Sequence, residues 1–426
     1  MRLSTSLPEP LISQFKVSAG LLVGCLQSAD GQGSERSGYV RLADLISRSL
    51  TDAPVKRRLL RESAVLFRAL RNAGILQLER DRDRPGSCVW VNEELQPNFS
   101  LDSTLSLYLV EALDAIHSEG QEHALDLLSL TESILENPRA LLIAQERRIK
   151  SELMAELKAD GVQFEERIEK LDQVTWPKPN AEFIYATFNQ FAEKHPWVGE
   201  ENIRPKAVAR ELYEDYAAFN DYVGRNQMAR MEGVLLRYLS QVHNTLTRTI
   251  PDAHKTDDVL DMIAYFHTLL GRVDASLLEE WQFRMNPGAA PTSEPQRADA
   301  QPTLDPKTFE ARVRSELHHL MRCLAKKDYA NAPACVHEDR DDPWDAARFE
   351  EELGPFYEEY EAILFQPSAR QAHLAQIKET SHHLYEARQV LSDDAGDNVF
   401  FIEAEVRIEQ LPLSEGPLLR LRRIGT

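Results

Sequence analysis

A low-complexity segment divides this chain of 426 residues into two parts with different hydrophobic patterns. Residues 287–303 are rich in Pro, Ala, Ser and Gln and show no periodicity, which is typical of a linker between domains. Before it, residues 98–286 carry apolar side chains at helical spacing almost throughout. Ser100 is expected to cap the first of these helices, and residues 139–159 are expected to form another. After the low-complexity segment, residues 304–426 begin with helical patterns and end with alternating ones. We therefore expect a mostly α fold with α+β ends.

The C-terminal part, residues 304–426, has the pattern of two helices followed by strands. Residues 309–324 and 349–365 are amphipathic, residues 384–391 suit a strand, and residues 400–409 alternate between apolar and polar as in a half-buried strand. One more strand is expected after Gly416. This order resembles the cone-shaped nuclear-transport-factor-2-like (cystatin-type) α+β fold. That fold has either a small-ligand pocket between helix and sheet or a surface used for homodimer formation.

The N-terminal part is expected to hold a lead-in segment, residues 1–38, and a winged-helix domain, residues 39–97. Two helical patterns precede two short strands, residues 75–78 and 88–91, which flank a charged tip, and Gly74 ends the second helix. Helices followed by such a hairpin suggest a winged helix, which docks a helix on nucleic acid or contacts another protein.

The charge of the chain is unevenly distributed. The net charge of −20 argues against a surface that is basic throughout. Residues 36–84, however, include twelve basic residues and only six acidic ones. This basic island includes Arg57, Arg58 and Arg61 on the second expected helix.

A stretch near the middle, residues 229–240, lies in the multi-helix bundle expected for residues 98–286. Its apolar residues recur at helical spacing and predict a buried stripe. Three charged residues interrupt the stripe; an arginine in such a place either lies along the surface or points at something outside the bundle. The stripe consists of Met231, Val234, Leu235, Tyr238 and Leu239, and the charged residues are Arg230, Glu232 and Arg237.

Motifs for catalysis, cofactors or metals are not visible. The sequence lacks a phosphate-binding GxxxxGK[ST] loop, a DExH box and the GxSxG, HExxH and GxGxxG patterns. The adjacent pairs His318-His319 and His382-His383 could hold a metal only if helix and strand met. The four cysteines are far apart in sequence and indicate thiols in a reducing cytoplasm. With no signal-peptide pattern and no apolar run of about 18 residues, we expect a cytoplasmic chain with no membrane contact, cofactor, metal or catalytic residue.

Several local motifs, in the same order along the chain, resemble the C-terminal region of bacterial superkiller-like (exosome-helicase-like) DExH RNA helicases. Residues 7–17 resemble the segment that leaves the second motor domain, and residues 39–95 the winged helix. Residues 98–113 resemble the start of the ratchet-type helical domain. Glu232-Gly233 and Arg237 match the E-G-x-x-x-R motif of that domain. Residues 273–281 and the C-terminal α+β domain, which is of unknown function in those helicases, continue the match.

The resemblance implies that residues 98–286 cover the path along which single-stranded RNA leaves a motor. Arg237 would then face the strand and pair with phosphate or stack on a base, while Glu232 would orient Arg237 or a neighbouring arginine. Both motor domains are missing from this sequence, which therefore resembles a separated C-terminal half or a truncated reading frame. We expect helicase activity only if the motor domains are supplied by another chain or lie outside this sequence. The candidates for nucleic-acid binding are Arg237, Arg230, Glu232, Arg57, Arg58 and Arg61.

Two alternatives remain open from the sequence. The chain can be a protein-interaction scaffold in which these arginines have structural roles, with a helicase motor or another protein as its partner. More distantly, its C-terminal domain can bind a small ligand or form a homodimer.

Overall fold

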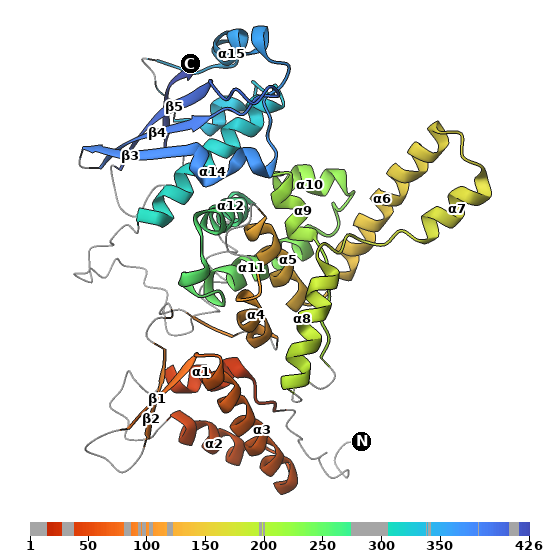
Figure 1. Ribbon diagram of the computed structural model, residues 1–426, viewed down its shortest axis with the longest axis vertical. Helices are drawn as coiled ribbons and strands as arrows, with labels where there is room; N and C mark the ends of the chain where they lie inside the picture. Colours follow the sequence, from red (N-terminus) through yellow and green to blue (C-terminus); the bar gives the residue numbers. More distant parts are fainter. Residues whose placement is uncertain are drawn as a thin grey trace, which may run out of the picture. The chain divides into compact units, whose positions relative to one another are not determined.

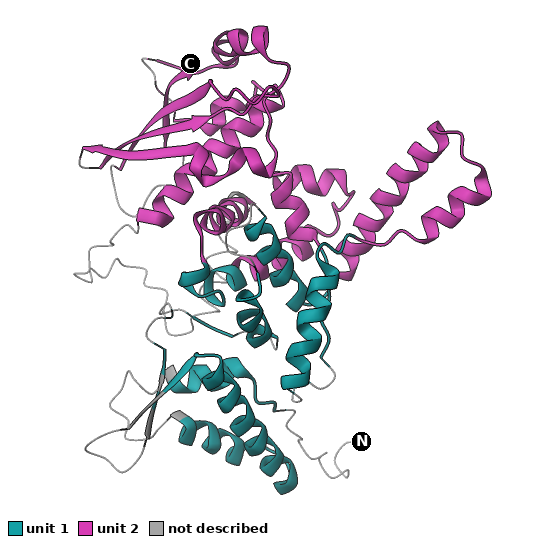
Figure 2. Cartoon of the chain, in the orientation of Figure 1, with its two compact units in different colours: residues 1–137, 177–206, 244–254 teal, residues 138–176, 207–243, 255–426 magenta. Residues whose placement is uncertain are grey.

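The computed structural model describes residues 15–27, 38–80, 87–92, 95, 99–101, 105–116, 122–195, 198, 201–273, 306–337, 339, 342–381, 383–408 and 417–426. The described chain is mostly helical, with a small four-stranded antiparallel sheet near the C-terminus (Figure 1). It forms two compact units, each made of several stretches (Figure 2). The first comprises residues 1–137, 177–206 and 244–254, and the second residues 138–176, 207–243 and 255–426. The expected linker 287–303 and the charged tip 81–86 lie outside the described residues.

The first unit begins with three helices and a hairpin: α1 (Ala19–Gln27), α2 (Gly38–Arg48), α3 (Ala53–Asn72), β1 (Leu76–Arg80) and β2 (Ser87–Val91). Helix α1, within the expected lead-in, contacts α2, α3 and β2. As predicted, Gly74 ends α3: its φ is +72°, and the N–H of Ile75 donates to the carbonyl of Leu70. The core side chains of these elements include Leu22, Val23, Leu42, Ile46, Leu59, Leu66 and Leu70.

The remainder of the first unit is built on α4 (Ser106–Leu113), α5 (His123–Ile134) and α8 (Ala181–Lys194). Tyr108 joins α4 to α8, since its hydroxyl donates to the carbonyl of Ile184 and lies 2.9 Å from the hydroxyl of Thr187. The sequence interpretation of Ser100 as a helix cap was wrong, because α4 begins only at Ser106. The backbone N–H of Ser100 instead donates to the carbonyl of Arg248.

The second unit contains the helices α6 (Arg139–Ala159), α7 (Phe164–Asp172), α9 (Val208–Glu214), α10 (Phe219–Arg225), α11 (Glu232–Arg248) and α12 (Asp257–Val273). The predicted bounds of α6 are confirmed, and α6 and α7 form a helical hairpin (Figure 1). The helical conformation is interrupted between α9 and α10, where Tyr216 has a φ of +46°. Only the first part of α11, residues 232–243, belongs to this unit.

The C-terminal part of the second unit packs two helices against the sheet. They are α14 (Pro306–Ala325) and α15 (Ala346–Glu359), and the strands β3 (Ala375–Ser381), β4 (Leu384–Val390), β5 (Phe401–Arg407) and β6 (Leu419–Gly425) pair in that order, all antiparallel. Strands β4 to β6 were expected, whereas β3 was not. Helix α15 ends before residue 365 because the chain turns extended at Tyr360. Short 3-10 turns occur at Asp252–His254 (η2), Ala332–Cys335 (η3), Pro367–Arg370 (η4) and Ala372–Leu374 (η5).

The space between these helices and the sheet is filled by large apolar side chains. They come from both helices and from the inward face of the strands, and such close packing is that of an ordinary core. This interior gives the small-ligand alternative no support. Its members include Phe309, Leu317, Met321, Leu324, Phe349, Leu353, Phe356, Ile402, Val406 and Leu419.

The other face of β5 is less exposed than its alternating sequence predicted. Phe401 is buried because the guanidinium groups of Arg388 and Arg423 lie over its ring, 3.5 and 4.9 Å from its centre. Glu405 is buried between Arg407 and Arg422. The charged residues of neighbouring strands therefore cover each other on this face.

Buried polar contacts join the C-terminal part to the helices before the linker. Arg314 of α14 pairs with Asp261 of α12, and both side chains are almost fully buried. The hydroxyl of Tyr216 lies 3.0 Å from that of Ser315. The segments on the two sides of the linker thus pack into one unit.

Candidate nucleic-acid interface

Helix α11 presents Arg237 to solvent. Leu235 and Leu239 are fully buried, and Arg237 lies two residues from each, about 200° around the helix axis. Core packing on one side of the helix therefore fixes the direction of Arg237 on the other. Val234 was predicted to be in the buried stripe, but it is 44% exposed and flanks Arg237 instead. It lies about 100° from Leu235, at the margin of the stripe.

Arg237 stands without a counter-charge in the described part of the chain. No described residue forms an ion pair or side-chain hydrogen bond with its guanidinium, whereas most arginines of the second unit have such partners. An exposed guanidinium retains all of its donors for an external anion. Arg237 is thus available for phosphate.

Gly233 lies one turn before Arg237 on the same side of α11. It is exposed, and a methyl group built at its Cα would meet nothing within 4 Å. A glycine at a helical position destabilises the helix by up to about 1 kcal/mol relative to alanine. The packing does not require this glycine, so its lack of a side chain leaves bare backbone beside Arg237.

The other two candidates on this segment lie differently. Arg230 is exposed in the turn before α11, which is anchored by the buried Met228. Glu232 is exposed in the first helical turn, where its charge favours the positive end of the helix dipole. It lies about 140° from Arg237 around the axis, and no ion pair between the two is present among the described residues.

Helix α3 of the first unit carries a second set of arginines. Its buried side is formed by Leu59, Leu66 and Leu70. On the opposite side, four exposed arginines fall within about 80° around the axis and extend over about 21 Å. We call them the α3 arginine face: Arg57, Arg61, Arg68 and Arg71.

Two of these four were not among the residues singled out from the sequence. Arg68 and Arg71 belong to the basic island, and their spacing from Arg57 and Arg61 was the signal that could have found them. Arg58 lies about 100° from Arg57 and pairs with Glu62 at 3.3 Å. Because Glu62 is the one acidic residue within α3, the α3 arginine face has little neutralisation from its own helix.

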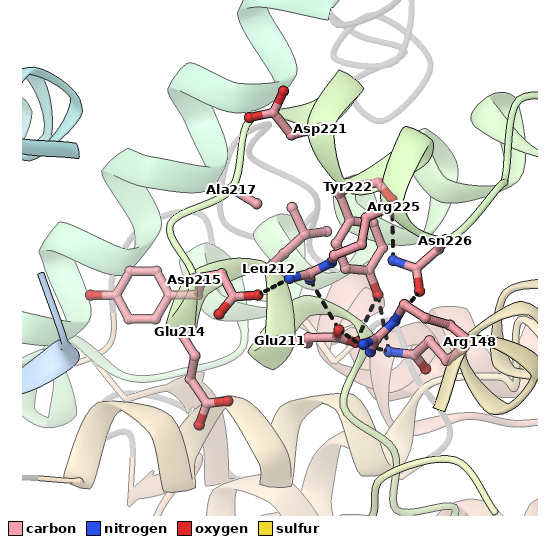
Figure 3. Close-up of polar contacts among 12 residues, drawn as sticks. Arg148, Glu211, Leu212, Glu214, Asp215, Ala217, Asp221, Tyr222, Arg225 and Asn226 are labelled. Carbon is pink, nitrogen blue, oxygen red and sulfur yellow. Dashed lines mark hydrogen bonds and ion pairs between the residues drawn. The ribbon is translucent and has the colours of Figure 1, made fainter. Parts of the chain in front are cut away.

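Other arginines of the second unit are held in a cluster around Glu211 (Figure 3). Arg148 and Arg225 both donate to the carboxylate of Glu211, and Arg148 also bonds Asn226 and Glu152. The amide nitrogen of Gln145 also donates to Glu211. This cluster ties α6 to α9 and α10 and leaves these guanidinium groups occupied, so we assign it a structural role.

The histidine pairs give no support to a metal site. His318 is buried on α14 with its ring 5.7 Å from that of Tyr216, and burial holds its pKa well below its usual value. His383 lies in the exposed turn before β4, and His382 is outside the described residues. Within the described ranges no three His, Cys, Asp or Glu side chains are grouped as metal ligands would be. Nor is any described helix both long and apolar enough to cross a membrane.

A protein-family model matches residues 1–422 of the chain. The matching family is described as a domain of unknown function, DUF3516. No curated protein and no solved structure matched the chain.

Proposed function

The chain belongs to the DUF3516 family, and we propose that it is a non-catalytic module that binds single-stranded RNA for a DExH-type helicase motor that lies outside residues 1–426. In this proposal α1–α3 with the β1–β2 hairpin form a winged helix, and the helices after it form a ratchet-type helical domain. The C-terminal α+β part corresponds to a nuclear-transport-factor-2-like fold and recruits a partner or a second copy.

The observation that carries this proposal is that Arg237 and Gly233 lie next to each other on the exposed side of α11. Arg237 offers a guanidinium with no counter-charge among the described residues, and Gly233 lets a strand approach the helix backbone one turn away. A guanidinium binds phosphate by paired hydrogen bonds and stacks on bases of any sequence. Such a contact holds a strand without reading it.

The α3 arginine face is the second element of the proposal. Phosphate contacts dominate the affinity of proteins for nucleic acids and make it depend on salt. Four exposed arginines on one side of one helix provide such contacts even though the whole chain is acidic.

The proposal is tested by fluorescence anisotropy with a labelled single-stranded RNA of about 12 nucleotides over a series of salt concentrations. Arg237→Ala is expected to weaken binding and to lower the slope of log K against log[salt] by about one unit. Arg61→Ala/Arg68→Ala should lower it by about two. Lys170→Ala is the matched control, because it removes one exposed positive charge that already pairs with Glu166.

The control variant should bind like the original chain. Absence of RNA affinity at low salt, or equal binding by the Arg237→Ala variant, would reject strand binding and favour the protein-interaction scaffold. Circular dichroism melting of every variant excludes loss of fold as the cause.

A further inference from the structure

Two cysteines that are twelve residues apart in sequence come together in the C-terminal part of the second unit. The sulfur atoms of Cys323, in the last turn of α14, and Cys335, at the end of η3, are 3.9 Å apart. Both are reduced thiols in this structure, and both are partly exposed. The sequence indicated cysteines that lie apart, because nothing in their spacing shows that the chain reverses between them.

The backbone between the two cysteines holds them in this position. Helix α14 ends in a Schellman turn, in which the N–H of Asp328 donates to the carbonyl of Cys323 and that of Lys327 to Leu324. Lys327 occupies the left-handed position of this turn, with a φ of +55°. The carbonyl of Asp328 then accepts the N–H groups of Asn331 and Ala332, which start η3.

The segment after Cys335 is fixed as well. The N–H of His337 donates to the carbonyl of Leu419 in β6, at 2.7 Å. Both sulfur atoms are therefore carried by hydrogen-bonded elements at the edge of a packed core. A disulfide requires a sulfur–sulfur distance of about 2.05 Å, and side-chain rotation about the Cα–Cβ bonds supplies movements of this size without refolding.

We propose that Cys323 and Cys335 are a modification site that forms a reversible intramolecular disulfide by exchange with a low-molecular-weight disulfide. One thiolate attacks a sulfur of the small disulfide, which forms a mixed disulfide and releases one small thiolate. The second cysteine thiolate then attacks the protein sulfur of that mixed disulfide and releases the other small thiolate. The two protons of the cysteines pass to the released thiolates, so one small disulfide is reduced to two thiols as the protein pair is oxidised.

The cross-link closes a ring that contains the Schellman turn and η3. It would fix the end of α14 to η3, and neither the α3 arginine face nor Arg237 belongs to these elements. The modification therefore stands independently of the proposed RNA binding.

The experiment uses the full chain with Cys25→Ser and Cys88→Ser, so that only the pair remains. The reduced protein is incubated with oxidised glutathione in native buffer and, in parallel, in urea. We expect an intact-mass loss of about 2 Da from the two hydrogens removed and a cross-linked peptide containing both cysteines. We also expect faster closure in native buffer than in urea, because the fold holds the sulfurs together.

A further Cys335→Ser replacement should leave a stable glutathione adduct on Cys323. Adducts without closure in the parent, closure no faster in native buffer than in urea, or links only between two chains would overturn the proposal. Melting of the oxidised and reduced forms provides a second measurement, because a native cross-link raises the melting temperature and a distorting one lowers it.

Discussion

The Nε atom of Arg314 lies 2.8 and 2.9 Å from the two carboxylate oxygens of Asp261. The two side chains are only 4% and 3% exposed. The pair joins α14 to α12, on opposite sides of the segment that the sequence indicates as a linker. A buried ion pair stabilises little relative to apolar side chains, but removal of one partner leaves a charge buried without compensation.

Asp261→Ala should therefore lower the free energy of unfolding of the second unit by about 3–5 kcal/mol. The double variant Asp261→Leu/Arg314→Met, which removes both charges and retains volume, should recover most of this loss. Urea denaturation followed by circular dichroism measures both. Glu310→Ala is the control, because the side chain of Glu310 is 42% exposed and lies 3.6 Å from the same arginine. The Glu310→Ala variant should lose less than about 1 kcal/mol of unfolding free energy. Equal losses in the single and the double variant would contradict the role of the buried charge.

We expect the buried Lys206 to make the stability of the first unit depend on pH. Its ammonium is buried and donates to the carbonyls of Glu132 and Leu135, at the end of α5, and of Arg204. Burial lowers the pKa of Lys206 from 10.5 to about 8, although the charge of Glu132 opposes this shift. The unfolded chain therefore binds more protons than the folded chain between pH 8 and 10.5, and the stability rises with pH in this window.

The Lys206 contribution should amount to at most about 3 kcal/mol across that window. Lys206→Met should abolish it, while Lys170→Met, at an exposed position, should retain it. Urea midpoints measured from pH 7 to 10 test this prediction. Parallel pH curves for the original chain and Lys206→Met would show that Lys206 keeps its ordinary pKa.

Arg148 pairs with two carboxylates, Glu211 and Glu152, that differ in how deeply they are buried. The side chain of Glu211 is 16% exposed and pairs with Arg148 and Arg225, whereas Glu152 is 55% exposed and pairs with Arg148 on the same helix. Glu211→Gln should lower the unfolding free energy by about 2 kcal/mol, because it leaves two guanidinium groups in a low-dielectric site with a neutral partner. Glu152→Gln should change it by about 0.5 kcal/mol. Similar shifts of the urea midpoint in both variants would contradict this ranking.

Local patterns in the sequence predicted the elements with clear boundaries. The bounds of α6 follow from Pro138 before it and from Gly161, with a φ of +70°, after it. The strand β5 follows from its alternating residues. Boundaries without such residues were less certain, as in α4, which begins several residues after the expected cap at Ser100.

Partners distant in sequence could not be predicted from local patterns. Helical spacing indicated that α11 has a buried side, but not that Val234 lies at its margin. The pairing of Arg148 with Glu211, 63 residues away, depends on how α6 meets α9. The sequence could thus name Arg237 as a candidate, whereas its lack of a counter-charge among the described residues required the structure.

The Gly233→Ala variant tests whether RNA binding, rather than folding, requires a glycine at this position. The new methyl group has open space, so the folded chain should be unchanged or up to about 1 kcal/mol more stable. If RNA passes beside Arg237, the same methyl group should weaken binding by roughly fivefold, equivalent to about 1 kcal/mol. The salt slope should stay the same because no charge is removed, in contrast to Arg237→Ala.

Gly224→Ala, at another exposed helical glycine with open space, should leave RNA affinity unaltered. Unchanged affinity of Gly233→Ala would place the strand away from this turn of α11, even if Arg237 contributes to binding.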